Sequence, residues 1–221
     1  MRFVREQSLA IVMFGIFAVT LAGLVFAGWG SYNEDRAGHG EAPIPLTRYL
    51  ASPAFGEAVF ENWESEFLQM GAYVLLTALL VSRGSAESKD PDGGGAQDAD
   101  PRAPSARRRR KAPWPVRRGG VALAIYEHSL TIALFALFVA SFALHAITGA
   151  SSFSSELVEH GGRAVSVLEY VATPRFWFES LQNWQSEFLS VGALIVLSIF
   201  LRQRGSPESK PVAAPHDETG G

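Results

Sequence analysis

The chain has 221 residues, of which 48% are hydrophobic and 19% are charged, with a formal net charge of -3 and no cysteine. The lack of cysteine excludes disulfides, thiolate nucleophiles, cysteine-ligated zinc or iron–sulfur centres and covalently attached haem, and no other cofactor is expected. Charged residues are almost absent from four apolar blocks and crowded between them. This distribution predicts an integral membrane protein.

The four apolar blocks are the expected membrane segments. Residues 8–29 carry no charge over about 22 residues, which crosses a hydrocarbon core of roughly 30 Å at 1.5 Å per residue. Residues 129–149 form the membrane portion of the third block. The uncharged cores of the second and fourth blocks, residues 67–82 and 188–201, are short for a span. We therefore expect their helices to begin upstream.

An internal repeat organises the chain. Each residue from Glu6 to Lys89 aligns without a gap to the residue 121 positions later, and about a third of the aligned positions are identical. The strongest matches are ENWESEFLQMGA with QNWQSEFLSVGA, and RGSAESK with RGSPESK. The predicted fold class is therefore all-α, an integral membrane four-helix bundle made of two parallel two-helix repeats. Its expected parts are a first two-span repeat, a disordered cytoplasmic linker, a second two-span repeat and a disordered C-terminal tail, at residues 1–89, 90–118, 119–210 and 211–221.

The second helix of each repeat has clear end signals. In the first copy Ser52 precedes Pro53, which places a hydroxyl at the N-cap and proline in the first turn. Arg83 suits the negative end of the helix dipole, and Gly84 can adopt the left-handed conformation that ends a helix. These signals predict a helix over residues 53–83, roughly 45 Å long. The equivalent residues of the second copy are Thr173, Pro174, Arg204 and Gly205.

The distribution of Lys and Arg predicts the topology. Of the 19 such residues, only Arg36, Arg48, Arg163 and Arg175 lie in the loops inside the repeats. The positive-inside rule then predicts a multi-pass protein of the bacterial inner membrane with both termini and the linker in the cytoplasm. A cleaved signal peptide is the competing reading of the N-terminus, but the equivalent segment of the second copy cannot be one.

A basic run stands near the end of the linker, at Arg107, Arg108, Arg109, Arg110 and Lys111. It can adhere to anionic lipid headgroups, or it can simply hold the linker on the cytoplasmic side of the third span. We favour the second reading. The lipid bilayer is the expected partner, and no nucleic acid is expected because neither a binding fold nor an aromatic platform accompanies the run.

The glutamates of the second helix fall into two groups when the sequence is projected at 100° per residue. Glu57, Glu61 and Glu64 share one face, which we read as solvated, whereas Glu66 lies on the apolar face. The second copy replaces the first group but retains the apolar-face glutamate. The four counterparts are Phe178, Gln182, Gln185 and Glu187.

Glu66 and Glu187 are the leading site candidates. An ionisable group on the apolar face of a membrane helix is by default a functional-site hypothesis, and proton or cation binding is the chemistry it suggests. The structural reading, which we prefer at this point, pairs Glu66 with Asn62 while Trp63 anchors the headgroup region. The corresponding partners in the second copy are Asn183 and Trp184.

His39 and His160 correspond across the copies, and each precedes a glycine in a predicted outer loop. With nearby glutamates they could bind zinc or copper, but fixed metal-ligand spacing is absent. A turn or hydrogen-bonding role is therefore the preferred interpretation, and no metal is expected.

The paired NWxSEF and RGSxESK strings resemble an uncharacterised family of bacterial inner-membrane proteins known only as a domain of unknown function. The resemblance covers both repeats and implies a multi-span membrane protein, without an activity or a substrate. No catalytic motif is found, so we expect no enzyme. A structural or envelope-associated protein is favoured, and a small transporter or ion- or proton-conducting oligomer that uses the paired glutamates is the alternative. A homodimer or a complex with another membrane protein is a further expectation.

Overall fold

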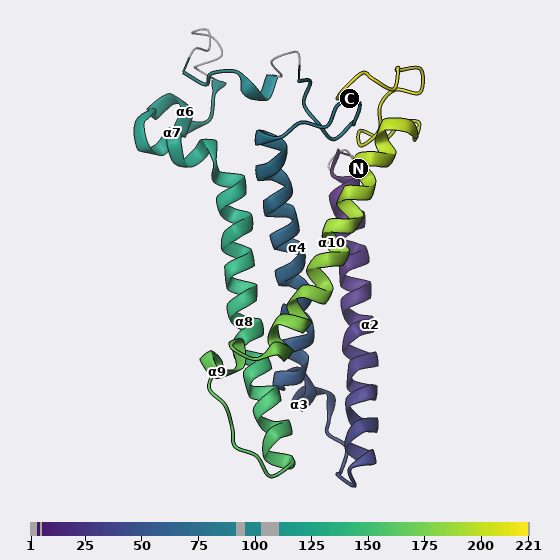
Figure 1. The fold of residues 1–221 in the computed structure, drawn as a ribbon, viewed down its shortest axis with the longest axis vertical. Coiled ribbons are helices and arrows are strands. Elements are labelled where there is room, and N and C mark those ends of the chain that lie inside the picture. Colours follow the sequence, from purple (N-terminus) through teal and green to yellow (C-terminus); the bar gives the residue numbers. More distant parts are fainter. Residues whose placement is uncertain (1–3, 5, 92–95, 103–110, 221) are drawn as a thin grey trace. The chain divides into compact units, whose positions relative to one another are not determined.

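The chain is helical in every regular element that the structure describes. The computed structural model describes residues 4, 6–91, 96–102 and 111–220, and Figure 1 follows them along the chain. No strand occurs among these residues. The predicted all-α class is confirmed. The elements are α2 (Ser8–Gly38), α3 (Leu46–Leu50), α4 (Pro53–Leu79), the 3-10 turn η1 (Ala96–Asp98), α6 (Trp114–Arg118), α7 (Gly120–Glu127), α8 (Ser129–Glu159), α9 (Val167–Val171) and α10 (Pro174–Phe200).

The helix bounds recur along the chain with the offset found in the sequence. Helices α2 and α8 both have 31 residues, and α8 begins and ends 121 positions after α2. The same offset separates α3 from α9 and α4 from α10, each pair being of equal length. The matching residues therefore fold into matching local structure.

Three described helices are long and apolar enough to cross a membrane, namely α2, α8 and α10. Helix α4 has 27 residues, as α10 does, but it is not one of the helices that meet this criterion. Four glutamates in its first half explain the difference, because charged side chains lower the hydropathy of a segment. The chain is thus a membrane protein by length and composition, while the fourth span is not established by this criterion.

Helix α4 ends at Leu79, four residues before the predicted end at Arg83. The chain folds back instead, and the Lys89 Nζ donates to the Ala78 carbonyl at 2.9 Å. Gly84 does adopt the predicted left-handed conformation, with φ of 84°. The sequence signal for the turn was correct, but the helix ends before it in both copies, since α10 ends at Phe200. The Ser82 and Gln203 N–H groups donate to the Ser88 and Ser209 hydroxyls rather than to helix carbonyls, which ends both helices early.

The start signals are confirmed in both copies. The Phe55 backbone N–H donates to the Ser52 hydroxyl, and the Phe176 N–H donates to the Thr173 hydroxyl, both at 3.3 Å. These are the N-cap hydrogen bonds that the sequence predicts.

The contacts divide the described chain into two compact units, which we treat separately. Unit 1 comprises Met1–Val59 and Leu144–Ala172, and unit 2 comprises Phe60–Ala143 and Thr173–Gly221. Unit 1 thus holds the loops inside the repeats, and unit 2 holds the conserved-looking strings of both repeats, NWxSEF and RGSxESK.

In unit 1 both copies contain the same clamp, in which one helix side chain bonds to the N–H and the carbonyl of a residue in the loop that follows. The Asn33 side chain accepts from the Ile44 N–H at 2.8 Å and donates to the Ile44 carbonyl at 3.2 Å. Ser154, which stands at the matching position, does the same to Val165 at 3.0 and 3.1 Å. One side chain therefore satisfies both polar backbone groups of an extended residue.

A tyrosine of each short helix packs against the long helix that precedes it. Tyr49 of α3 lies over Gly28 of α2, and Tyr170 of α9 lies over Gly149 of α8. Tyr49 and Tyr170 are only 4% and 0% exposed, so surrounding atoms enclose both side chains. A Cβ at Gly149 would stand 2.6 to 2.8 Å from three atoms of the Tyr170 ring and hydroxyl. Only glycine permits this approach.

We predict that Gly149→Ala lowers the thermal stability of the detergent-purified protein by the equivalent of about 1–3 kcal/mol, because the added methyl overlaps a buried ring. Gly28→Ala should act in the same direction. The matched control is Gly23→Ala, where a Cβ meets nothing within 4 Å and the better helix propensity of alanine should stabilise slightly. Equal melting of Gly149→Ala and Gly23→Ala would contradict the seating of Tyr170.

Candidate functional site

A polar stripe runs along α4 inside unit 2. Glu61, Ser65, Gln69, Tyr73 and Thr77 follow one another at intervals of four residues, so they form one ridge of the helix. Ser65 and Gln69 are buried, and the other three are half-buried. Polar groups within a membrane helix are costly unless they face protein or a water-filled cavity, so this ridge is a candidate functional face of α4.

The two NWxSEF strings meet at the start of this ridge. Glu61 of α4 accepts from the Asn183 amide at 2.6 Å and from the Gln182 amide at 3.1 Å. The Trp184 indole N–H donates to the Glu64 carboxylate at 3.2 Å. Glu61 and Gln182 occupy matching positions of the two repeats, so equivalent residues face each other across the α4–α10 interface.

This arrangement differs from the solvated face that the sequence suggested for Glu61 and Glu64. Glu64 is 0% exposed and the Glu61 carboxylate is engaged by two amides. The helical periodicity grouped the glutamates of α4 correctly, but the sequence analysis assumed that the apolar face of this helix is the one that packs against protein. In α4 the inward face is polar because its partner helix supplies amide and indole donors.

The two leading candidates lie near each other but outside this hydrogen-bonded network. Glu66 is exposed and Glu187 is half-buried, and the two carboxylates act on each other electrostatically. Asn62 is exposed, and Trp63 packs edge-on against Phe60 with ring centroids 5.8 Å apart. The roles assigned to these residues from the sequence stay predictions.

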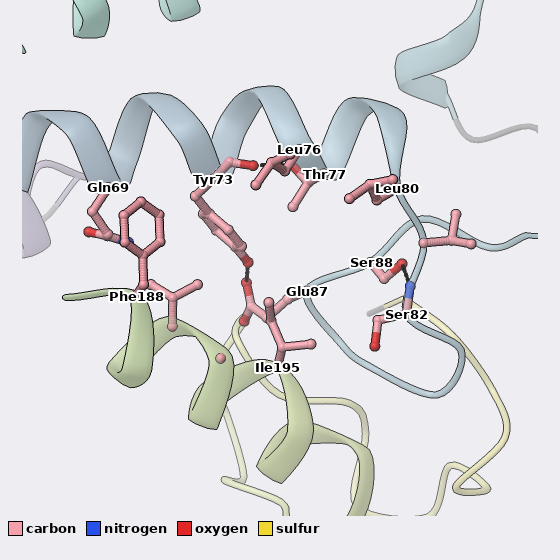
Figure 2. A pocket seen from close by; sticks show the side chains of 13 residues that line it. Gln69, Tyr73, Leu76, Thr77, Leu80, Ser82, Glu87, Ser88, Phe188 and Ile195 are labelled. Carbon is pink, nitrogen blue, oxygen red and sulfur yellow. Dashed lines mark hydrogen bonds between the residues drawn. The ribbon is translucent and has the colours of Figure 1, made fainter. Parts of the chain in front are cut away.

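Beyond the NWxSEF strings the ridge lines a cavity of about 310 Å³ between α4 and α10 (Figure 2). Gln69, Tyr73 and Thr77 face it from α4. Most of the remaining wall is apolar, apart from a polar end formed by the loop after α4. The other lining residues are Leu76, Leu80, Val81, Ser82, Glu87, Ser88, Phe188, Val191, Gly192 and Ile195.

The RGSxESK strings build the loop at this end and its equivalent after α10. Ser88 accepts from the Ser82 N–H at 2.8 Å, and Ser209 accepts from the Gln203 N–H at 2.9 Å, the same bond in each copy. A second matched pair has the Ser85 hydroxyl accepting from the Glu87 N–H, at 3.1 Å, with Ser206 and Glu208 as the counterparts at 3.2 Å. These are short-range hydroxyl turns, so each serine is explained by the local backbone.

The glutamates of these two strings form a carboxyl pair. The Tyr73 hydroxyl donates to Glu87 Oε2 at 2.5 Å, as Figure 2 shows. The other oxygen of Glu87 is buried, and no donor nitrogen or hydroxyl reaches it among the described residues. The Glu208 carboxyl is exposed and lies close enough to Glu87 for the two groups to interact electrostatically. A hydrogen bond between two carboxyl groups requires that one of them carries a proton.

Glu87 also perturbs the titration of its partner. The hydrogen bond with Glu87 and the repulsion from its charge raise the pKa of Glu208, and partial burial adds to the effect. Glu208 therefore keeps its proton to a higher pH than an isolated glutamate does. No Lys or Arg nitrogen lies within ion-pair distance of either carboxyl in the part of the chain that the structure describes.

The neighbouring cations are bound elsewhere. Lys89 contacts the Ala78 carbonyl and Asp98, and Arg202 donates to backbone carbonyls at the end of α10. Lys210 is 1% exposed and donates to three carbonyls of the C-terminal segment. Residues 211–220, for which the sequence predicts disorder, thus make defined contacts, and the Gly220 N–H also donates to the Ser85 carbonyl.

The loop histidines meet at a separate pocket in unit 1. His39 and His160 both line it, with four acidic side chains, at Asp35, Glu41, Glu156 and Glu159. The Nδ1 of each histidine lies within 2.9 Å of the carbonyl oxygen four residues before it. That carbonyl and the nearby carboxylates raise the pKa of His39. No group of three metal-ligating side chains is placed to hold an ion in the described ranges, so the metal reading gains no support.

The basic run of the linker falls almost wholly outside the described residues, which include Lys111 but none of Arg107–Arg110. The described parts of the linker contain η1 and α6, and the Arg118 guanidinium lies 5.1 Å from the centre of the Trp114 ring. The proposed lipid contact of the run stays a prediction.

Comparison with known proteins supports one assignment. A family model described as a domain of unknown function, DUF6766, matches residues 1–221. The chain belongs to the DUF6766 family. No curated protein and no solved structure matches the chain significantly. Family membership therefore agrees with the resemblance noted in the repeated strings, and the chemistry of the site must be argued from the residues themselves.

Sequence reasoning missed the residues that line the cavity. Glu87 and its counterpart Glu208 stand in the sequence analysis only as members of the RGSxESK strings, and no site role was assigned there to Gln69 or Tyr73. The four-residue spacing of Glu61, Ser65, Gln69, Tyr73 and Thr77 was the available signal. It was obscured because the helix was classified by its glutamates alone.

We predict that Glu64→Ala destabilises the protein by about 1–3 kcal/mol, because the half-buried Trp184 N–H loses its acceptor and the buried Glu64 side chain leaves a gap. Glu66→Ala is the matched change one half-turn away, and it should leave melting nearly unchanged because Glu66 is exposed and its loss relieves repulsion with Glu187. Detergent melting curves of the two variants test this ranking. The reverse order would support the sequence-based choice of Glu66.

Proposed function

We propose that this is a four-span protein of the bacterial inner membrane, built from two tandem two-span repeats with both termini and the linker in the cytoplasm. Helix α4 is the proposed fourth span. Its bounds match those of α10 at the repeat offset, and its polar ridge is covered by protein rather than exposed. The Lys and Arg asymmetry supports the orientation.

The topology predicts the compartment of four fusion points. Reporters placed after Gly84 and after Gly221 should behave as cytoplasmic, and reporters after Gly40 and Gly161 as external. Each point is a turn or chain end, so insertion disturbs little regular structure. A cytoplasmic signal at Gly40 with an external signal at Gly84 would invert the proposed orientation, and one shared compartment for these two points would remove α4 as a span.

We further propose that the protein binds and moves protons or small cations at the α4–α10 interface. The single observation that carries this proposal is the polar ridge of α4, which continues past a cavity to an unneutralised carboxyl pair within one compact unit. Glu87 is half-buried with one buried oxygen, and an acid of this kind without a fixed counter-ion is suited to reversible binding of a proton or cation.

The pattern of divergence between the repeats supports this function over a purely structural one. At the first pair, Glu61 faces Gln182, so an acceptor meets a donor and the contact is stable without a proton. At Glu87 and Glu208 both copies retain glutamate, and the contact requires a proton or a cation. A structural role would be served as well by a Glu–Gln pair at the second position.

The mechanism follows from the order of groups along α4. The shared proton of the Glu87–Glu208 pair leaves when a cation takes its place, and Tyr73 holds Glu87 in position by donating its hydroxyl proton to Oε2. Gln69 and Thr77 offer further polar contacts within the cavity. The protein is proposed to be non-enzymatic, in line with the sequence analysis, which finds no catalytic motif. Assembly as a homodimer or with another membrane protein belongs to the same proposal.

The structural, envelope-associated role is the competing function, and the Glu61 and Glu64 contacts between α4 and α10 favour it. Under that role the NWxSEF strings simply fasten two helices together. The distinction is therefore whether the Glu87–Glu208 pair titrates during activity or only supports the fold.

We predict that Glu87→Gln combined with Glu208→Gln abolishes pH-dependent proton or cation flux into liposomes while melting is retained, because glutamine keeps the size but not the titration. Glu159→Gln, an exposed loop carboxylate, is the control and should behave as wild type. Wild-type protein without any flux above empty liposomes, or full flux in the double variant, would favour the structural role.

A further inference from the structure

We propose that the cavity between α4 and α10 binds a lipophilic monovalent cation, with its apolar groups against the cavity wall and its charge at the Glu87–Glu208 carboxyl pair. This inference rests on the proposed function and names the class of its substrate. The observation behind it is that an apolar cavity of about 310 Å³ has a polar end that includes an acid without a counter-ion.

The cavity has the size and lining of a small-molecule site. Clefts of a few hundred Å³ with mostly apolar walls and a few polar groups are typical of ligand sites. Here Leu76, Leu80 and Val81 contribute from α4 and the residues after it, and Val191 and Ile195 contribute from α10. Tyr73 and Phe188 add aromatic surface, against which an organic cation can stack.

Charge selects among the apolar ligands that could enter. One end of the cavity carries Glu87, which adjoins Glu208, and the described cations near them are engaged by carbonyls or by Asp98. An anionic lipid headgroup would meet repulsion there, whereas a cation would be attracted. A strongly hydrated metal ion would not use the apolar walls, so an organic cation fits both features.

Glycine at position 192 leaves the cavity open on the α10 side. Gly192 lines the cavity, and a Cβ at this position would meet no atom within 4 Å. A larger side chain can therefore be introduced without displacing the backbone, and it would occupy the space assigned to the ligand. Gly23 of α2 also has open space around it but does not line the cavity, so it provides a matched control.

Binding is an exchange that balances charge. The pair with one shared proton carries one negative charge; a monovalent cation enters and the proton leaves to solvent, so the net charge of the site is unchanged. Tyr73 on α4 is the titratable group that interacts with both carboxyls, and it donates to Glu87. Lys89, Arg202 and Lys210 stand in the loops after α4 and α10, but they donate to Asp98 or to backbone carbonyls. The exchange predicts weaker binding as the pH falls, by up to about tenfold per unit where the pair is protonated.

The test uses the full chain in lipid nanodiscs and tetraphenylphosphonium as the probe, measured by equilibrium dialysis against empty nanodiscs. Tetraphenylborate, of the same shape and opposite charge, reports partition into lipid. We expect saturable binding of the phosphonium only. Gly192→Leu and Glu87→Gln should each weaken it at least about tenfold, and Gly23→Leu should leave it unchanged.

Equal uptake of both probes, or phosphonium binding that is indifferent to Glu87→Gln, would overturn the inference and indicate a lipid-filled groove. Because Gly192→Leu can affect folding, Glu87→Gln and the pH dependence in wild-type protein provide independent readouts. If the phosphonium does not bind while Glu87→Gln with Glu208→Gln still abolishes flux, the ligand class is wrong and the proposed function stands. If it binds but no flux responds to the carboxyl pair, the proposed function fails and the binding site stands.

Discussion

The structure depends on the need to satisfy the polar side chains along α4. If α4 spans the membrane as proposed, hydrocarbon offers these groups no hydrogen bonds, so the ridge from Glu61 to Thr77 requires protein beside it. Helix α10 provides the amides of Gln182 and Asn183 and the indole of Trp184. The contact between these helices is therefore specified by polar pairing as well as by packing.

Duplication explains why so many contacts occur twice. The Asn33 clamp, the packing of Tyr49 over Gly28 and the Ser88 turn all recur 121 residues later, because matching local sequences make matching contacts. Divergence is informative where equivalent residues face each other. Two identical carboxylates repel, so replacement of one by glutamine at position 182 converts repulsion into a hydrogen bond. Retention of both at 87 and 208 keeps the site dependent on a proton or cation.

The fold and the chemistry use different parts of each repeat. Unit 1 contains the backbone clamps, the glycine–tyrosine contacts and the pocket lined by His39 and His160. Unit 2 contains the ridge, the cavity and the carboxyl pair. Glu87 and Glu208 thus lie in the loops after α4 and α10. Lys210 and the C-terminal segment hold these loops through hydrogen bonds.

The sequence by itself determined the all-α class, the repeat offset and the N-caps at Ser52 and Thr173, because these follow from local composition and spacing. The tertiary structure decided which face of α4 turns inward, where that helix ends and which glutamates meet. Periodicity groups residues on faces but does not state what lies opposite each face. The burial of Glu64 depends on the Trp184 indole, and the end of α4 depends on the Ser88 hydroxyl. The proximity of Glu87 and Glu208 depends on the contact between two chain segments 121 residues apart.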